Sequence, residues 1–154
     1  RGLDVDTSVL VEPMLLGQEL TCGVLVEEAS EGVSPLPSIL IEPIGHAFFD
    51  FESKYTPGHN REICPAPITE ELETTLQRLA MASHRALDCR DISRTDFIVT
   101  DQGPVILEVN TLPGLTEASL IPKSAAAAGL SFDDLIQRLI IRSIRRTKSR
   151  AESI

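Results

Sequence analysis

Two alternating stretches joined by a turn place the tightest limit on how this chain folds. Residues 93–100 and 104–110 alternate apolar and polar side chains, and Asp101-Gln102-Gly103 between them has the composition of a hairpin turn. Alternate residues of a strand point to one face, so each stretch has one face suited to a core. The residues expected on that face are Thr95, Phe97, Val99, Val105, Leu107 and Val109. A β-hairpin over residues 93–110 is therefore predicted.

The other face of this hairpin carries charge. A slip of one residue would turn every side chain of a strand to the wrong side, so the two core faces fix the register. A turn centred on Gln102 places Asp96 opposite Glu108 and Arg94 opposite Asn110. Directly opposed carboxylates repel, and a divalent cation between them is the simplest reason to keep them.

Carboxylate and amide oxygens are ligands that Mg²⁺ and Mn²⁺ prefer, so Asp96, Glu108 and Asn110 are candidate metal ligands. A solvated surface hairpin, in which Arg94 neutralises a carboxylate, fits the same pattern. The hairpin alone leaves both interpretations open. The residues that follow favour the metal, because Gly114 allows a close backbone approach and Ser119 stands where a helix would be capped. A metal face, a glycine loop and a helix N-terminus together describe an anion site.

Length, charge and cysteine content limit the class of protein. The 154 residues are 42% hydrophobic, which is enough for one domain with a core, and the longest apolar run is far short of the roughly 20 residues of a membrane span. A net charge of −9 argues against nucleic acid as a partner. Three widely spaced cysteines predict free thiols in a reducing cytoplasm. The start, Arg1-Gly2-Leu3-Asp4, resembles neither a methionine start nor a signal peptide, so we expect a portion of a longer protein.

The remaining patterns predict an antiparallel sheet packed with helices, which is an α+β layer design. The expected strands besides the hairpin cover residues 8–12, 19–27, 36–41 and 47–51, with turns over 28–32 and 44–46. The expected helices cover residues 69–87, 119–128 and 131–147, the last capped by Ser131 and Asp134. Residues 52–67 read as a long loop, and residues 52–66 are predicted to be the most mobile internal segment.

Five segments, taken in order, resemble the D-alanine–D-alanine ligases of the ATP-grasp superfamily. They are residues 11–21, residues 50–55, the Arg94-Thr95-Asp96 strand, the Glu108-Val109-Asn110 strand and residues 113–123. The resemblance runs over nearly the whole chain. Each motif is weak by itself, and their joint order and spacing make the match specific.

The resemblance implies a nucleotide site. Glu12 and the backbone around Met14 and Leu15 would take the adenine edge, and Glu19 would accept hydrogen bonds from the ribose hydroxyls. An aromatic residue is common in the family where this chain has Met14, so the chain departs from the family's pattern at this position. The nucleotide set is completed by Phe48 and by Lys54, which would pair with the γ-phosphate.

The resemblance also implies the catalytic residues. Asp96, Glu108 and Asn110 would hold two Mg²⁺ or Mn²⁺ ions that bridge the ATP phosphates. Arg94 and the Gly114 N–H would stabilise the developing oxyanion. Further residues implied at the amino-acid side are Tyr55, at the mouth of the second amino-acid site, and Ser119, on the carboxylate of the second D-alanine.

The implied activity is the ATP-dependent joining of two D-alanines for peptidoglycan synthesis, through an acyl phosphate. Residues 1–27 would be the trailing part of the central ATP-binding domain and residues 28–154 the C-terminal domain. The family's N-terminal domain has no counterpart here, so we expect weak nucleotide binding and no turnover from these residues alone. The implied partners are D-alanine and ATP, with no nucleic acid and no membrane. The whole enzyme would be cytoplasmic, and a homodimer is its possible assembly.

Two alternatives stay open. Another ATP-grasp carboxylate–amine ligase, or one that joins D-alanine to D-lactate, would use the same residues, although Tyr55 after Lys54 favours an amine substrate. A protein that kept the fold as a non-catalytic nucleotide- or metal-binding module is the alternative from a different class. The intact set Asp96, Glu108 and Asn110 argues against a loss of metal chemistry.

Overall fold

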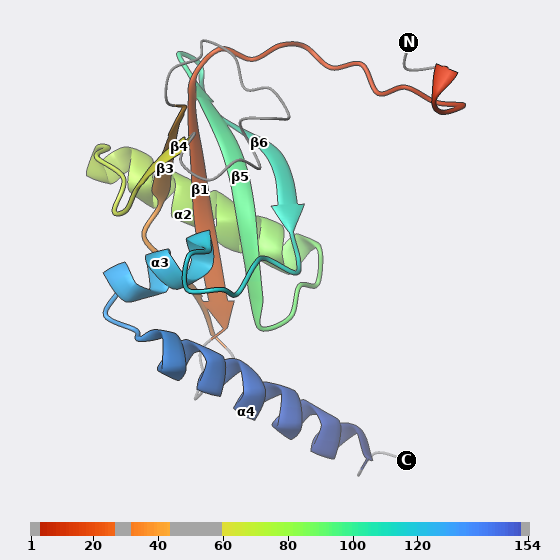
Figure 1. Cartoon of the computed structure of the whole chain (residues 1–154), viewed down its shortest axis with the longest axis vertical. Helices are drawn as coiled ribbons and strands as arrows, with labels where there is room; N and C mark the ends of the chain where they lie inside the picture. Colours follow the sequence, from red (N-terminus) through yellow and green to blue (C-terminus); the bar gives the residue numbers. More distant parts are fainter. Residues whose placement is uncertain (1–3, 27–31, 44–59, 152–154) are drawn as a thin grey trace.

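The computed structural model describes residues 4–26, 32–43 and 60–151, and its centre is an antiparallel sheet (Figure 1). The strands are β1 (Gln18–Val26), β2 (Val33–Pro35), β3 (Ile39–Pro43), β4 (Asn60–Ile63), β5 (Ile92–Thr100) and β6 (Gly103–Asn110). The sheet has the order β4-β3-β1-β5-β6, and β2 pairs with β1 beside that path. The predicted α+β class is confirmed.

Helix α2 (Glu70–Ala86) covers one face of the sheet, behind the strands in Figure 1. Thr69 caps it by accepting a hydrogen bond from the Leu72 N–H, and its buried face meets alternate residues of β1 and β5. The main core consists of Leu20, Cys22, Val24, Leu40, Leu76, Ala80 and Phe97. The helix predicted over residues 69–87 is confirmed.

Helices α3 (Leu120–Ala127) and α4 (Phe132–Ala151) lie on the opposite face, at the end of the sheet where β1 finishes (Figure 1). Their core consists of Leu25, Leu36, Ile92, Ile121, Ala125 and Leu135. A Cβ on Gly23 would come within 2.6 Å of the Ile121 side chain, so this glycine allows α3 to approach the sheet closely. The two helices cover this end of the face and leave its other end to polar side chains.

Local capping explains where α4 begins and what holds it. Ser131 Oγ accepts from the Asp134 N–H at 3.1 Å and donates to Asp134 Oδ2 at 2.6 Å, so the predicted cap is confirmed. Arg142 Nε donates to Asp91 Oδ1 at 3.0 Å, and Arg146 also pairs with Asp91. Within the residues that the structure describes, no helix is long and apolar enough to cross a membrane.

Three predicted elements differ from the structure. The strand predicted over residues 8–12 is wrong: the segment extends away from the sheet (Figure 1), with Leu10 and Val11 80% and 87% exposed. The strand predicted over 36–41 is wrong as a single element, because β2 ends before Leu36 and β3 begins at Ile39. The long loop ends earlier than predicted, because Asn60–Ile63 forms β4 against β3. Outside the described residues lie the predicted strand over 47–51, the turn over 44–46, residues 28–31 of the turn predicted over 28–32, and residues 52–59 of the loop predicted over 52–67.

The hairpin forms, with a register shift that the alternation does not reveal. Near the turn Thr100 pairs with Gly103, so the turn lies between Asp101 and Gln102 and not on Gln102 as predicted. A β-bulge between Asp96 and Phe97 then adds one residue on β6. The bulge restores the predicted pairs, Asp96 with Glu108 and Arg94 with Asn110. Between the turn and the bulge Val105 pairs with Ile98 and not with Val99, and Leu107 is the extra residue of the bulge. Leu107 and Val105 are 51% and 38% exposed, so their predicted place in the core is wrong.

His84 gives the fold a pH-dependent stability. Its ring is 2% exposed, Nδ1 lies 2.7 Å from Ser93 Oγ, and Nε2 has no hydrogen-bond partner among the described residues. Burial lowers the pKa of His84 below its ordinary value, with a further lowering from Arg85. The unfolded chain therefore binds a proton that the folded chain resists, and stability present above about pH 6.5 is lost as the pH falls through the folded pKa.

We expect the free energy of unfolding to be lower at pH 5.5 than at pH 7.5, measured by urea denaturation. The His84→Gln variant cannot take up this proton, so it should lose part of the difference between the two pH values. An unchanged difference in that variant would show that His84 does not contribute.

Candidate functional site

Three neighbouring strands place polar side chains on the part of the sheet face that α3 and α4 leave uncovered. The register pairs Thr21 of β1 with Asp96 of β5, and Asp96 with Glu108 of β6. Since alternate residues of a strand share a face, the neighbours two positions away lie on this face too. The group, called the polar face below, consists of Glu19, Thr21, Arg94, Asp96, Glu108 and Asn110.

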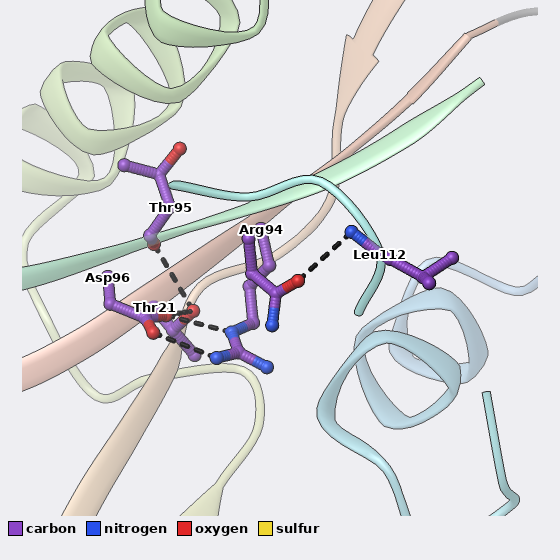
Figure 2. Close-up of polar contacts among 6 residues, drawn as sticks. Thr21, Arg94, Thr95, Asp96 and Leu112 are labelled. Atoms are coloured by element: carbon purple, nitrogen blue, oxygen red, sulfur yellow. Dashed lines mark hydrogen bonds and ion pairs between the residues drawn. The ribbon is translucent and has the colours of Figure 1, made fainter. Parts of the chain in front are cut away.

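Arg94 and Asp96 form a bidentate pair at the centre of the polar face (Figure 2). Arg94 Nε donates to Asp96 Oδ1 and Arg94 Nη2 donates to Asp96 Oδ2, each at 2.8 Å. The side chains are 18% and 14% exposed, so this pair is more than a loose surface contact. The hydrogen bonds from Arg94 to Asp96 raise the pKa of the guanidinium against the opposing effect of burial, and the charges of Asp96, Glu108 and Glu19 add to the rise.

The Arg94–Asp96 ion pair neutralises the Asp96 carboxylate, as the surface-hairpin interpretation requires. It also leaves the metal interpretation standing, because Glu108 is exposed and faces Asp96 across the hairpin. Asn110 Oδ1 accepts from the Leu112 N–H at 3.0 Å, and an amide oxygen keeps a second lone pair. In the part of the chain that the structure describes there is no cluster of three or more His, Cys, Asp or Glu, so any cation here would depend on the amide oxygen and on ligands from outside the hairpin. The oxygen donors fit Mg²⁺ or Mn²⁺ in type.

The loop after β6 leads to Ser119 at the start of α3. Its hydroxyl accepts from the Thr116 N–H at 3.1 Å and lies 2.8 Å from Thr116 Oγ1. Ser119 occupies the N-cap position of α3 as predicted, but its side chain makes no capping hydrogen bond. The first N–H groups of this helix are therefore not capped by Ser119. A Cβ on Gly114 would lie 2.8 Å from Ser119 Oγ, which explains why the smallest residue stands there.

The structure does not gather every predicted site residue. Glu12, Met14 and Leu15 lie on the extended segment before β1, and of these Glu12 and Met14 are exposed. That segment makes no strand with the rest of the described chain, and the adenine edge stays a prediction. Glu19 is close enough for its charge to act on Arg94. Phe48, Lys54 and Tyr55 lie outside the described residues.

Sequence reasoning missed one residue of the polar face, Thr21. Its hydroxyl donates to Asp96 Oδ1 at 2.6 Å, and it also lies 3.2 Å from the Thr95 carbonyl oxygen (Figure 2). The available signal was its position two residues after Glu19 in an alternating strand, which places both on one face.

The cysteines take no part in this face. All three are free, as predicted, and burial raises the pKa of the Cys22 thiol to about 12. Burial also raises the pKa values of Cys64 and Cys89, so none of them is an activated thiolate.

The antiparallel sheet with its acidic hairpin is the fold of the C-terminal part of an ATP-grasp ligase, as similar solved structures show. The chain belongs to the family described as "D-ala D-ala ligase C-terminus", whose model matches residues 1–141.

Among curated relatives, the D-alanine–D-alanine ligase of Oleidesulfovibrio alaskensis is 53% identical over 132 residues. That match covers 85% of this chain and 41% of the relative, so the chain spans about two fifths of the length of such relatives. The solved D-alanine–D-alanine ligase of Bacillus anthracis complexed with ATP is 35% identical, with a TM-score of 0.69. That match covers 89% of this chain and 43% of the solved chain. The VanG D-Ala:D-Ser ligase of Enterococcus faecalis is 34% identical, with a TM-score of 0.68. That match covers 82% of this chain and 36% of the solved chain.

Proposed function

We propose that this chain is part of an ATP-dependent ligase that joins two D-alanines into D-alanyl-D-alanine for peptidoglycan. The observation that carries the proposal is the family match over residues 1–141. The polar face of this chain supports it by placing Arg94 opposite Asn110 and Asp96 opposite Glu108. The proposal includes use of Mg²⁺ or Mn²⁺, a cytoplasmic location and a homodimeric whole enzyme.

The proposed chemistry has two steps. The carboxylate of the first D-alanine attacks the γ-phosphorus of ATP, which forms an acyl phosphate and releases ADP. The amine of the second D-alanine then attacks the acyl carbon, and the C–O bond to phosphate breaks as the peptide bond forms. The amine loses a proton, and inorganic phosphate leaves. No protein nucleophile is needed, so the residues contribute position and charge.

The polar face suits that contribution. Two divalent ions held by Asp96, Glu108 and Asn110 would offset the charge of the transferring phosphoryl group. The Arg94 guanidinium keeps its charge in this site, because its pKa is raised, and it has donors beyond the two that contact Asp96. Those donors and the Gly114 N–H would stabilise the oxyanion that forms when the acyl carbon becomes tetrahedral. Ser119 would hold the carboxylate of the second D-alanine, while Glu12, Met14, Leu15, Glu19, Phe48, Lys54 and Tyr55 keep the nucleotide and substrate roles that the family resemblance implies.

A second candidate concerns the second substrate. The VanG D-Ala:D-Ser ligase has nearly the same identity to this chain as the ATP-bound D-alanine–D-alanine ligase, 34% against 35%. D-serine is therefore kept as a candidate second substrate, and we rank D-alanine first because the more similar curated relatives carry that name.

The proposal is tested by exchanging the matched part of the Oleidesulfovibrio alaskensis ligase for this chain. We expect the chimera to release phosphate from MgATP only when D-alanine is added, and to form D-alanyl-D-alanine, identified by mass spectrometry. D-serine and D-lactate supplied with D-alanine test the second candidate and the D-lactate alternative. ATP binding without turnover would support the non-catalytic module, if the relative's own enzyme is active in the same assay.

A further inference from the structure

Thr21 holds the Asp96 carboxylate from the neighbouring strand. It lies on β1 directly opposite Asp96 and is 2% exposed. Its hydroxyl has one proton and two acceptors in reach, Asp96 Oδ1 at 2.6 Å and the Thr95 carbonyl at 3.2 Å. The carboxylate is nearer and charged, so it takes the proton.

The donors around Asp96 determine which of its oxygens can bind anything else. Oδ1 accepts from Thr21 Oγ1 and Arg94 Nε, which fills its two lone pairs. Oδ2 accepts from Arg94 Nη2 and, among the described residues, keeps one lone pair. While Thr21 and Arg94 stay in place, Asp96 can bind a cation only through Oδ2, with one oxygen.

Thr21 differs from Arg94 in what it fixes. Arg94 and Asp96 are two residues apart on β5, so their paired side chains can swing together without breaking the pair. Thr21 belongs to β1, and its short side chain has a single rotatable bond before the hydroxyl. Its hydrogen bond therefore ties the Asp96–Arg94 pair to the sheet.

We propose that Thr21 is a positioning residue that sets the orientation of the Asp96 carboxylate for a divalent cation. This inference rests on the proposed function for the identity of the cation, while the positioning itself is a property of the metal-free chain. Thr21 would then orient a metal ligand by a hydrogen bond, as residues around metal sites commonly do.

The test compares two pairs of side chains at position 21, threonine with valine and serine with alanine, and the members of each pair differ by a hydroxyl. Thr21→Val keeps the shape of the side chain and removes its hydroxyl, and Thr21→Ser against Thr21→Ala repeats the comparison at smaller size. Thr95→Val is the matched control: Thr95 is also buried, on the adjacent strand, and its Oγ1 has no partner among the described residues. Circular dichroism and urea denaturation establish that each variant is folded.

The first readout needs no metal. In nuclear magnetic resonance spectra of the metal-free chain, the Arg94 Nε–H should give a slowly exchanging signal in the wild type, Thr21→Ser and Thr95→Val. Thr21→Val and Thr21→Ala should show that proton exchanging at least about 10-fold faster. The second readout is Mn²⁺ binding in the presence of ADP, measured by electron paramagnetic resonance. We expect about 10-fold weaker Mn²⁺ binding in Thr21→Val and Thr21→Ala, and wild-type binding in Thr21→Ser and Thr95→Val.

The two readouts separate this inference from the proposed function. Unchanged exchange of the Arg94 proton in folded Thr21→Val and Thr21→Ala would overturn the positioning role. Changed exchange with unchanged Mn²⁺ binding would overturn its effect on the cation. A wild-type chain that binds no Mn²⁺ would count against the proposed metal site, and the exchange measurement would still decide whether Thr21 positions Asp96.

Discussion

Arg94→Ala is expected to lower kcat for D-alanine-dependent phosphate release by about 100- to 1,000-fold in the chimeric enzyme. The reason is that a preorganised donor aimed at an oxyanion is worth about 2.7–4 kcal/mol in the transition state. The variant also leaves the Asp96 carboxylate, now 14% exposed, without its bidentate partner. The steady-state rate at saturating MgATP and D-alanine measures the effect.

Arg94→Lys serves as the comparison, because it keeps the charge and loses the planar fork that holds both oxygens of Asp96. It should recover only part of the lost rate. An Arg94→Ala enzyme within about threefold of its parent would show that the Arg94–Asp96 pair is structural and that the oxyanion is stabilised elsewhere.

Glu108→Gln is expected to reduce turnover at least about 100-fold while changing the free energy of unfolding by about 0.5 kcal/mol or less. Glu108 is exposed, and substitutions at such positions usually have small effects on stability. Removing one of two facing carboxylates also relieves their repulsion. Turnover should fall because the neutral amide no longer offsets the charge of a divalent ion.

The control for this variant is Glu117→Gln, an exposed carboxylate in the loop before α3 that is not part of the polar face. It should leave both turnover and stability unchanged. Equal losses of turnover in the two variants would point to a general effect of surface charge, and a large loss of stability in Glu108→Gln would mean that the hairpin depends on this side chain.

The elements that the sequence predicted well are those whose signal is local. The α2 helix carries its own N-cap and apolar stripe, and α4 carries the Ser131–Asp134 cap, so neither needs a distant partner to be recognised. The pairing of Asp96 with Glu108 was also predicted, since alternation limits the register to a few choices. The predicted pairing is correct because a bulge compensates for the position of the turn, and alternation does not predict that bulge.

Two of the failures concern partners that lie far away in the sequence, and one concerns the hairpin itself. Residues 8–12 have a strand-like pattern, but a strand needs a neighbour, and the described chain supplies none. The position of the turn shifted the pairing of Val105, and the bulge left Leu107 outside the β5–β6 pairing and 51% exposed. Thr21 was missed because its role depends on β1 lying beside β5, some 75 residues apart in sequence, and nothing in its immediate neighbours indicates that pairing.

The claim that the polar face binds a divalent cation with nucleotide is tested most directly by Mn²⁺ in nuclear magnetic resonance spectra of this chain. Mn²⁺ broadens the signals of nearby amides, so a small occupied fraction is enough for detection. With ATP present, we predict broadening centred on Asp96, Glu108 and Asn110, and its loss in Glu108→Gln. Broadening centred instead on other exposed acids, such as Asp133 and Asp134 at the start of α4, with the hairpin signals unchanged, would contradict the account.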